Sequence, residues 1–383
     1  MKNILLVGGG HAHLPALRQA SVLARFGARV TLVAPESHHY YSGMGPGILG
    51  GIYRPRQTRV AVERLIHSRG GHFVRGAVAR IDPAARTVTL SDGRTLPFDL
   101  ASFNTGSRVP VEKLTGAQDE RVVPVKPIEK LVQARRRLLE GRGGPEQRVL
   151  VVGGGPAGVE LAANLARLDR AHSLGLRVTV VDQGERLLAR MPERAARIAT
   201  RVLASQGVSF RPRLRLASLG PGDARSDAGE SFPYDLAFLT LGIAPHTLYA
   251  DSGLPTAPDG GLRVDRHLQV VGLPGVFGGG DCVSFDAGTL PRVGVYAIRQ
   301  GPVLYRNLLS SLKGDPLTPF RPQKRYVLIL NLGDGTGLVV WGPWVWRGRL
   351  GFRWKNHLDT SFMERFQRCG ELQETDTEEP WAS

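Results

Sequence analysis

The chain has 383 residues, of which 42% are hydrophobic, and it carries a formal net charge of +16. This length suits two or three domains, and the hydrophobic fraction is too high for a disordered protein. Two cysteines exclude a disulfide framework and a four-cysteine zinc or iron–sulfur site, and they fit a reducing cytoplasm.

The N-terminal residues lack the features of a signal peptide, because the apolar run over residues 4–7 is short and leads directly into glycines. No stretch of about 18 apolar residues predicts a membrane span. We therefore expect a cytoplasmic protein, with peripheral attachment to the inner face of the cell membrane as the alternative. The net positive charge favours binding of anionic ligands. The alternative is a basic surface that is solvated and binds no ligand. We expect no nucleic-acid partner, since no known binding module accompanies the charge.

The chain reads twice as a strand, a glycine-rich turn, a helix and a second strand. The first unit has a strand over 3–7, the turn Gly8-Gly9-Gly10, a helix to about residue 26 and a strand over 28–34. The second unit has a strand over 148–152, the turn Gly153-Gly154-Gly155, a helix to about residue 168 and a strand over 176–182. The repetition predicts an internal duplication of a dinucleotide-binding unit.

Each unit has a later strand that ends in a similar turn. The strand over 98–107 runs into Thr105-Gly106-Ser107, and the strand over 234–245 runs into Thr240-Leu241-Gly242. Segments 78–81, 87–90 and 95–99 read as antiparallel hairpins. Beyond a proline-containing linker over 310–322, segments 326–332 and 337–341 flank Gly333-Asp334-Gly335 and predict a further hairpin.

The first glycine turn has the chemistry of a pyrophosphate site. Gly8 permits the tight turn, Gly10 lets the backbone approach a pyrophosphate, and the helix start at His11 and Ala12 supplies a positive dipole. The third position holds His13 instead of Gly or Ala. Glu36, just after the second strand, is the candidate for the ribose hydroxyls, and a surface glutamate is the alternative. His11 and His13 alone do not make a metal site, so we expect no metal.

The second glycine turn is complete, with Gly153, Gly155 and Gly158 in the expected positions. Asp182 ends the next strand and is placed to accept hydrogen bonds from a ribose diol. Because an acid there repels a 2′-phosphate, NADH is the expected cofactor and NADPH the less favoured one. Gln183 and Arg186 leave that choice open. Glu160 lies in the first helical turn, where it either complements the helix dipole or contacts the nicotinamide carboxamide.

A third motif joins a strand to a glycine turn over residues 275–281 and ends in Gly280 and Asp281. In a flavoprotein, an aspartate at this point can hydrogen-bond the ribityl chain, and the start of the next helix faces the flavin pyrimidine ring. The order of the motifs resembles that of the flavoproteins with two dinucleotide-binding domains, the pyridine nucleotide-disulfide oxidoreductase superfamily. The match covers about residues 1–315.

Within that superfamily the chain most resembles the type II NADH dehydrogenase and sulfide:quinone oxidoreductase branch. More narrowly, it is similar to the NADH-dehydrogenase-like module fused to some selenophosphate synthetases. The segments that carry this closer likeness are 41–47, 295–301, 331–335 and 362–367.

The resemblance implies an α/β fold with two Rossmann-like domains, the second inserted in the first, and a small C-terminal α+β region. The FAD-binding domain is expected over 1–110 and 265–315, the NAD(P)-binding domain over 111–264, and the C-terminal region over 316–383. Gly45 and Pro46 are then expected beside the isoalloxazine, and Lys126 near the flavin or nicotinamide. A Lys close to the flavin would stabilise the anionic reduced form, whereas a surface lysine is the alternative.

Two departures from the family narrow the chemistry. No cysteine precedes Cys282, which argues against the flavin-flanking cysteines of sulfide:quinone oxidoreductases. The two glutamines of the quinone motif align with Val295 and Arg299, which places quinone as the acceptor in doubt. The adjacent Gln300 is the residue expected to face the flavin.

The C-terminal region combines aromatic and basic residues with an acidic tail over 371–383. Together the tryptophans and arginines suit an anionic membrane surface, and a packed hairpin or a homodimer interface are the alternatives. A helix over 357–368 is expected to present one apolar stripe, Leu358, Phe362 and Phe366. The aromatic and basic residues concerned are Trp341, Trp344, Trp346, Trp354, Arg347, Arg349, Arg353 and Lys355.

The leading hypothesis is an FAD-dependent NADH dehydrogenase that takes hydride onto flavin N5 and passes electrons to a quinone or another small acceptor. Pro46, Lys126, Glu160 and Gln300 are the candidates near the reacting atoms, and no side-chain base is required. One rival is a sulfide- or selenium-directed oxidoreductase that uses Cys282 or Cys369. The other is a flavin redox sensor or partner-binding module without enzymatic activity.

Overall fold

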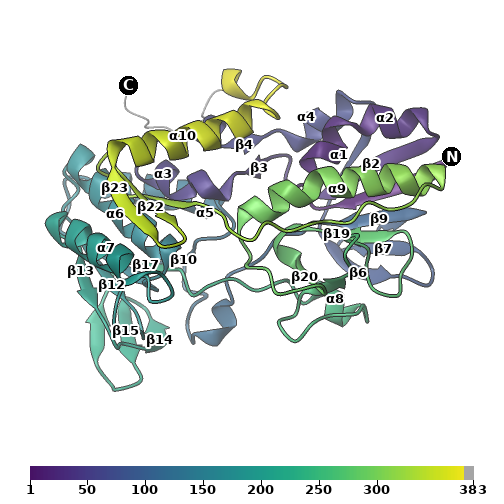
Figure 1. Ribbon diagram of the computed structural model, residues 1–383. Helices are drawn as coiled ribbons and strands as arrows, with labels where there is room; N and C mark the ends of the chain where they lie inside the picture. The colour runs from purple at the N-terminus through teal and green to yellow at the C-terminus, as the bar shows by residue number, and fades with distance from the viewer. Residues whose placement is uncertain (375–383) are drawn as a thin grey trace.

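The computed structural model describes residues 1–374 and has two parallel β-sheets side by side, with a small C-terminal unit packed against them (Figure 1). The first sheet has the order β19-β9-β1-β2-β5 and the second β10-β17-β11-β12-β13. Every pairing in both is parallel. The first sheet comprises Lys2–Val7 (β1), Ala28–Ala34 (β2), His72–Arg75 (β5), Leu100–Phe103 (β9) and Val276–Gly278 (β19). The second comprises Val122–Pro124 (β10), Gln147–Val152 (β11), Leu176–Val181 (β12), Ser209–Arg211 (β13) and Leu236–Leu239 (β17).

The two sheets repeat one strand order, because β9-β1-β2-β5 corresponds to β17-β11-β12-β13. This confirms the predicted α/β fold with two Rossmann-like units. The chain leaves the first sheet after β9 and returns to it at β19, after the strands of the second sheet. The expected domain boundaries are compatible with this path and stay a prediction.

Helices cover both sheets, which explains why the central strands are apolar on both faces. Over the first sheet lie Leu14–Arg18 (α1), Ala20–Arg25 (α2), Val62–His67 (α4) and Gly294–Lys313 (α9). Against the second lie Glu129–Glu140 (α5), Pro156–His172 (α6) and Glu193–Ser205 (α7). The short helix Gly45–Leu49 (α3) packs against α5 and α6.

Short antiparallel ribbons complete the two halves. The predicted hairpins are present as Val78–Asp82 (β6), Thr87–Leu90 (β7) and Thr95–Pro97 (β8). Leu216–Gly220 (β14), Asp223–Ser226 (β15) and Ser231–Pro233 (β16) form a second three-stranded ribbon. His39–Tyr40 (β3) pairs with Arg59–Val60 (β4) in antiparallel fashion, whereas Leu262–Val264 (β18) and Val283–Phe285 (β20) form a parallel pair. Leu248–Asp251 is α8.

The first helix differs from the prediction of one continuous element to residue 26. The helix breaks at Gln19, and α1 begins at Leu14, six residues after Gly8, whereas α6 begins at Pro156, three residues after Gly153. The late start goes with His13, which stands where the second unit has Gly158, a position at which a Cβ would overlap the carbonyl of Gly153. The His13 Nδ1 lies 2.6 Å from the carbonyl oxygen of Gly8, so the ring occupies the space that a first helical turn would need.

The C-terminal unit consists of Leu328–Asn331 (β21), Gly337–Trp341 (β22), Trp344–Gly348 (β23) and Arg349–Glu364 (α10). The predicted hairpin is therefore present, with a third strand added. The predicted helix over 357–368 begins eight residues earlier, at Arg349, and ends four residues earlier. Within 1–374, no helix is both long and apolar enough to cross a bilayer. Asp376, Glu378 and Glu379 of the acidic tail lie outside the described residues.

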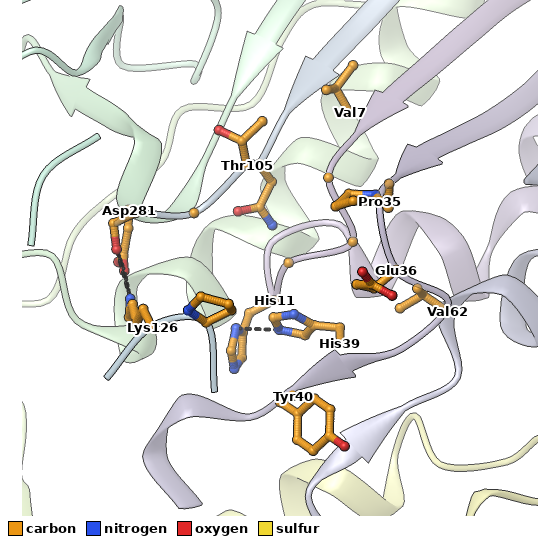
Figure 2. A pocket seen from close by; sticks show the side chains of 18 of the residues that line it. Val7, His11, Pro35, Glu36, His39, Tyr40, Val62, Thr105, Lys126 and Asp281 are labelled. Carbon is orange, nitrogen blue, oxygen red and sulfur yellow. Dashed lines mark hydrogen bonds and ion pairs between the residues drawn. The ribbon is translucent and has the colours of Figure 1, made fainter. Parts of the chain in front are cut away.

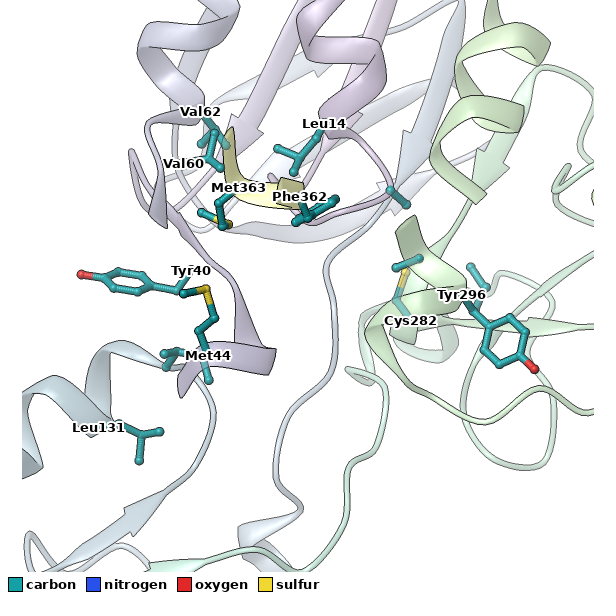
Figure 3. Packing of buried hydrophobic residues seen from close by; sticks show 14 of the residues in the cluster. Leu14, Tyr40, Met44, Val60, Val62, Leu131, Cys282, Tyr296, Phe362 and Met363 are labelled. Carbon is teal, nitrogen blue, oxygen red and sulfur yellow. The ribbon is translucent and has the colours of Figure 1, made fainter. Parts of the chain in front are cut away.

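One hydrophobic core joins all three parts of the molecule. Figure 3 shows Phe362 and Met363 of α10 next to Leu14 of α1, with Met44 and Leu131 on the neighbouring elements. The C-terminal hairpin also contacts α6 directly, since the guanidinium of Arg170 donates to the carbonyl oxygen of Gly333 at 3.2 Å. These contacts fix α10 over the junction between the two sheets.

Candidate functional site

A cavity of about 410 Å³ lies at the carboxyl ends of β1, β2 and β9 (Figure 2). Ligands of doubly wound sheets bind at this edge, because the turns after parallel strands all open there. The cavity is lined by eight of the residues predicted to bind a cofactor or lie near it. These are Gly8, Gly10, His11, Glu36, Thr105, Gly106, Lys126 and Asp281.

The first glycine turn is held by Asn104, a residue that the sequence motifs did not single out. Gly8 has φ +91°, and a Cβ there would overlap the backbone carbonyl of Asn104. A Cβ on Gly10 would lie 2.7 Å from Asn104 Nδ2. That Nδ2 is buried and has no hydrogen-bond partner among residues 1–374. The close packing on Asn104 therefore requires glycine at both positions. The Asn104 side-chain N–H group remains available to donate a hydrogen bond to a ligand beside the turn.

Lys126 and Asp281 meet at one end of the cavity, although 155 residues separate them in sequence. The Lys126 ammonium donates to Asp281 Oδ2 and to the hydroxyl oxygen of Ser107, both at 2.8 Å. The Ser107 hydroxyl in turn donates to Asp281 Oδ2 at 2.9 Å. A fixed cation and a fixed acceptor thus face the same space, which favours a ligand that carries both polar and anionic groups.

Gln300 contacts the third glycine turn, at Gly280. Its side-chain oxygen accepts the N–H of Gly280 at 2.7 Å, and the side chain is buried. A Cβ on Gly280 would lie 2.5 Å from Asn104 Oδ1, so this turn and the first one pack on the same asparagine. Gly280 and Gln300 line a neighbouring cavity that shares Asp281 with the first.

The histidines near the first turn are neutral. Burial lowers the pKa of His13 to about 4, and its Nε2 lies 2.9 Å from the Ser102 hydroxyl. Burial, together with the charge of Lys126, lowers the pKa of His11 to about 3. His11 Nδ1 lies 3.0 Å from Nε2 of His39, whose pKa burial also lowers. In the part of the chain that the structure describes, no group of three or more His, Cys, Asp or Glu residues could hold a metal ion.

The second glycine turn has the same construction on the second sheet. A Cβ on Gly153 would lie 2.5 Å from Thr240 Oγ1, and a Cβ on Gly158 would overlap the carbonyl of Gly153. Both carboxylate oxygens of Asp182 accept backbone N–H groups at 2.6 Å, from Gly154 and Gly184. Asp182 therefore lies against the turn at the carboxyl end of β12.

The remaining predicted residues lie around these two turns. Gly155 precedes α6 in extended conformation, and Gly242 adopts φ +83° in the turn after β17. Ala12 is fully buried behind the first turn. Gly45 and Pro46 are buried in α3 and do not line the first cavity. Val295 is partly buried on α9, and Arg299 is exposed there.

Glu160 belongs to a buried polar cluster between α6, the segment before α3 and α10. The cluster consists of Glu160, Tyr41, Lys355 and Asp359, and it is called here the α10 cluster. The Lys355 ammonium donates to Asp359 Oδ2 and to the carbonyl of Gly43, both at 2.8 Å. The Tyr41 hydroxyl donates to Asp359 Oδ1 at 3.1 Å. Glu160 Oε1 accepts the N–H of Asn331 at 2.6 Å.

Burial decides the protonation of the α10 cluster. Burial raises the pKa of Glu160 to about 7, although Lys355 opposes the shift. Burial also raises the pKa of Asp359, against the attraction of Lys355. Burial alone would lower the pKa of Lys355, but the carboxylates of Asp359 and Glu160 raise it. The short Lys355–Asp359 pair is best described as ionised, which leaves Glu160 as the group that exchanges a proton near neutral pH.

The two cysteines are separate and differently exposed. Cys282 is fully buried, and its thiol lies 3.3 Å from the carbonyl oxygen of Gly279. Burial raises the pKa of the Cys282 thiol, so the reactive thiolate is disfavoured. Cys369 is partly exposed, and its sulfur lies 3.8 Å from the Ser68 hydroxyl.

Comparison with known proteins identifies what the chain resembles. The sequence profile described as pyridine nucleotide-disulphide oxidoreductase matches residues 2–301. Ferroptosis suppressor protein 1 of Taeniopygia guttata is 27% identical over 88% of this chain and 88% of its own length. Demethylphylloquinone reductase NdbB of Synechocystis is 29% identical over 74% of this chain and 73% of its own. The structure of NDH2 from Plasmodium falciparum in complex with NADH superposes over 100% of both chains, with 14% identity and a TM-score of 0.79.

Proposed function

Because the chain belongs to the pyridine nucleotide-disulphide oxidoreductase family, we propose that it is an FAD-dependent enzyme that oxidises NADH and reduces a quinone or another small acceptor. Proteins of this family bind FAD and a pyridine nucleotide. The observation that carries the proposal is the cavity at the end of the first sheet, whose walls are glycine backbone, a fixed cation and a buried unpartnered donor.

The residues of the first cavity fit FAD. Gly8 and Gly10 line the cavity with backbone that a pyrophosphate can approach, and Asn104 Nδ2 offers a donor there. Glu36, which follows β2 and lines the cavity, would accept hydrogen bonds from ribose hydroxyls. Lys126 would favour negative charge on the flavin, while Asp281 would accept from ribityl hydroxyls. When bound, FAD supplies the hydride-accepting and electron-transferring chemistry.

The second turn is the proposed NADH site. Gly155, where a Cβ would meet no atom within 4 Å, leaves room for a pyrophosphate at the N-terminus of α6, a helix of 17 residues. Gly153 and Gly158 let the turn pack closely. Asp182 is held by two backbone N–H groups and presents negative charge at the end of β12. A 2′-phosphate would lie against this charge, so we propose NADH as the donor in preference to NADPH.

The α10 cluster is the proposed proton source for the acceptor. Reduction of a quinone to a quinol consumes two protons, and Glu160 titrates at about pH 7. The cluster lies between the NADH-binding helix α6 and the C-terminal helix α10. One similar protein carries the name of a quinone reductase, which supports a quinone as acceptor.

The opposite side of α10 suits an anionic membrane surface. Six of the ten exposed large apolar residues within 1–374 gather on β22, β23 and α10. Leu350 is 70% exposed and Trp344 72%. Arg349 and Arg353 lie beside Leu350 and Trp354 on the helix, so basic residues flank its exposed apolar residues. The predicted stripe is divided, because Phe362 and Phe366 are buried in the core while Leu358 is exposed. The six residues, called here the Trp face, are Trp341, Trp344, Trp346, Leu350, Trp354 and Leu358.

The experiment that tests the proposal is anaerobic titration of the flavin-loaded protein with NADH, followed in the flavin absorbance band. Rapid bleaching by NADH, slower bleaching by NADPH and reoxidation by a soluble quinone are the expected results. Flavin that NADH does not bleach would remove the dehydrogenase proposal.

A matched pair of variants tests the donor site. Asp182→Ala is expected to raise the KM for NADH by about tenfold or more and to change kcat much less, because a ribose contact is lost in ground and transition state alike. Asp251→Ala, on α8, is the control and should leave both constants unchanged. An unchanged KM in Asp182→Ala would contradict this donor site.

The sulfur-directed rival finds less support, because Cys282 is buried with a raised thiol pKa. Replacement of both cysteines by serine should leave turnover unchanged. A loss of turnover in a folded double variant would favour the rival.

A further inference from the structure

After α10 the chain lies against the segment that contains the β3–β4 ribbon. Figure 1 shows this last yellow segment beside β4 and α4. Gln367 begins the contact, since its side-chain amide donates to the carbonyls of Arg56 and Arg59, both at 2.9 Å. Residues 370–374, called here the strap, follow with a 3₁₀ turn over Glu371–Gln373.

Glu371 anchors the strap at the start of α4. Its side chain is fully buried, and Oε1 accepts the N–H of Ala61, the residue that caps α4, at 3.2 Å. Oε2 accepts the N–H of Cys369 at 2.7 Å. A carboxylate is stable in a buried position only when hydrogen-bond donors surround it. The contact therefore requires an acidic residue at position 371.

Glu374 closes the strap with a set of basic partners. Its Oε2 accepts from the Arg59 guanidinium at 2.6 Å, and its Oε1 is paired with Arg64. Oε1 also lies 3.1 Å from Nε2 of His38. Burial and the charges of Arg59 and Arg64 lower the pKa of His38 to about 4, so a neutral imidazole donates to Glu374. The backbone carbonyl of Glu374 accepts from Arg56 at 3.1 Å.

One of these partners, His38, belongs to a wall of the first cavity, whereas the three arginines do not line it. His38, His39 and Tyr40 line it, and β3 pairs with β4 through His39 and Val60. The Arg59 guanidinium contacts both Glu374 Oε2 and the Tyr40 hydroxyl, the latter at 3.1 Å. The strap therefore contacts the cavity wall directly through the Glu374–His38 hydrogen bond and indirectly through Arg59, which connects Glu374 to Tyr40. Glu36, two residues before His38, belongs to the same wall.

We propose that the strap is a latch on the cofactor cavity: Glu371 and Glu374 hold the β3–β4 wall closed and thereby set the rate at which FAD leaves. The inference rests on the proposed function, because it takes FAD as the occupant of the first cavity. Without the Glu374 carboxylate, Arg59 and Arg64 lose the anion that they share, and His38 loses its side-chain contact with the strap.

The test is the first-order rate of flavin release from the purified holoprotein, read as free FAD fluorescence. Glu374→Gln keeps the shape of the side chain and is expected to release FAD at least about fivefold faster, because the loss of one partner of a half-buried charge pair acts mainly on dissociation. Glu364→Gln removes the same charge from an exposed position on α10 and is expected to release FAD at the wild-type rate.

A second measurement varies the salt concentration. Salt screens the partly exposed Arg64 pair, so high ionic strength should speed FAD release from the wild type and affect Glu374→Gln much less. Wild-type release that is insensitive to salt, or equal release from wild type and a folded Glu374→Gln, would overturn the latch alone. A wild-type protein that binds no FAD would overturn the proposed function, and the latch with it.

Discussion

At the scale of single residues, the glycine turns show what a sequence can reveal about a site. Gly8, Gly10, Gly153 and Gly158 could be identified from the sequence because these positions require glycine. At each of them a Cβ would overlap the backbone or a neighbouring side chain. Asn104 was not readable in this way. Its role comes from contacts with two turns that are far apart in sequence, and nothing in the local pattern distinguishes it from a strand-end residue.

Glu160 carries a prediction about pH. Its pKa of about 7 in the folded protein exceeds the ordinary value of 4.5, so the folded state holds this proton more tightly than the unfolded chain. Its contribution to stability is therefore complete below about pH 4.5 and is lost as the pH rises through about 7. Relative to Glu160→Gln, the wild type should lose on the order of 2 kcal/mol of unfolding free energy between about pH 5 and pH 8.

Urea denaturation at both pH values checks this expectation. The exposed Glu364→Gln variant is the control and should keep the wild-type pH dependence. Parallel curves for wild type and Glu160→Gln would show that Glu160 does not hold its proton in the folded protein.

At the scale of elements, the strands of both sheets and the helix α6 could be predicted from the local sequence pattern. The ends and interruptions of the other helices could not. The late start of α1 goes with the position of the His13 ring, and the break at Gln19 has no local signal such as a proline. Similarly, α10 begins eight residues before the predicted start, because the residues from Arg349 to Asn356 have a buried side only when β22 is present beside them.

The β21–β22 turn offers a test of how the C-terminal unit is attached. Gly333 has φ +68°, and a Cβ there would overlap the backbone carbonyl of Ala163 in α6. Gly335 has φ +78° and no neighbouring atom within 4 Å of such a Cβ. Gly335→Ala should cost about 1 kcal/mol from backbone strain alone. Gly333→Ala should cost at least about 2 kcal/mol more, because α6 and the hairpin must separate. Urea midpoints of the two variants measure the difference, and equal midpoints would mean that the contact does not hold the hairpin.

The Trp face of β22, β23 and α10 predicts binding to vesicles. The double variant Leu350→Ser, Trp354→Ser removes two exposed apolar side chains and should weaken binding to phosphatidylserine vesicles at least about tenfold. Phe26→Ser, which removes an exposed aromatic from the first unit, is the control and should bind as the wild type does. Binding that is unchanged in the double variant would remove the membrane surface from the proposal.

At the scale of the whole molecule, the duplication was predictable because each unit repeats the same local signals in the same order. The α10 cluster was not, since Tyr41 and Asp359 are 318 residues apart and meet only when the C-terminal helix closes over both sheets. Because one apolar core runs through both sheets and α10, thermal unfolding of the holoprotein should be a single transition with the same midpoint by circular dichroism and flavin fluorescence. Two separated transitions would mean that the halves fold independently.

The unequal burial of the two thiols has a practical consequence. Cys282 is closed off beneath the third glycine turn, whereas Cys369 is partly exposed one residue before the strap. A maleimide dye should therefore attach to a single position in the native protein, with no need to remove other cysteines. That position places a fluorophore beside the segment that contacts the cofactor wall, so the natural sequence already provides an optical reporter of strap movement.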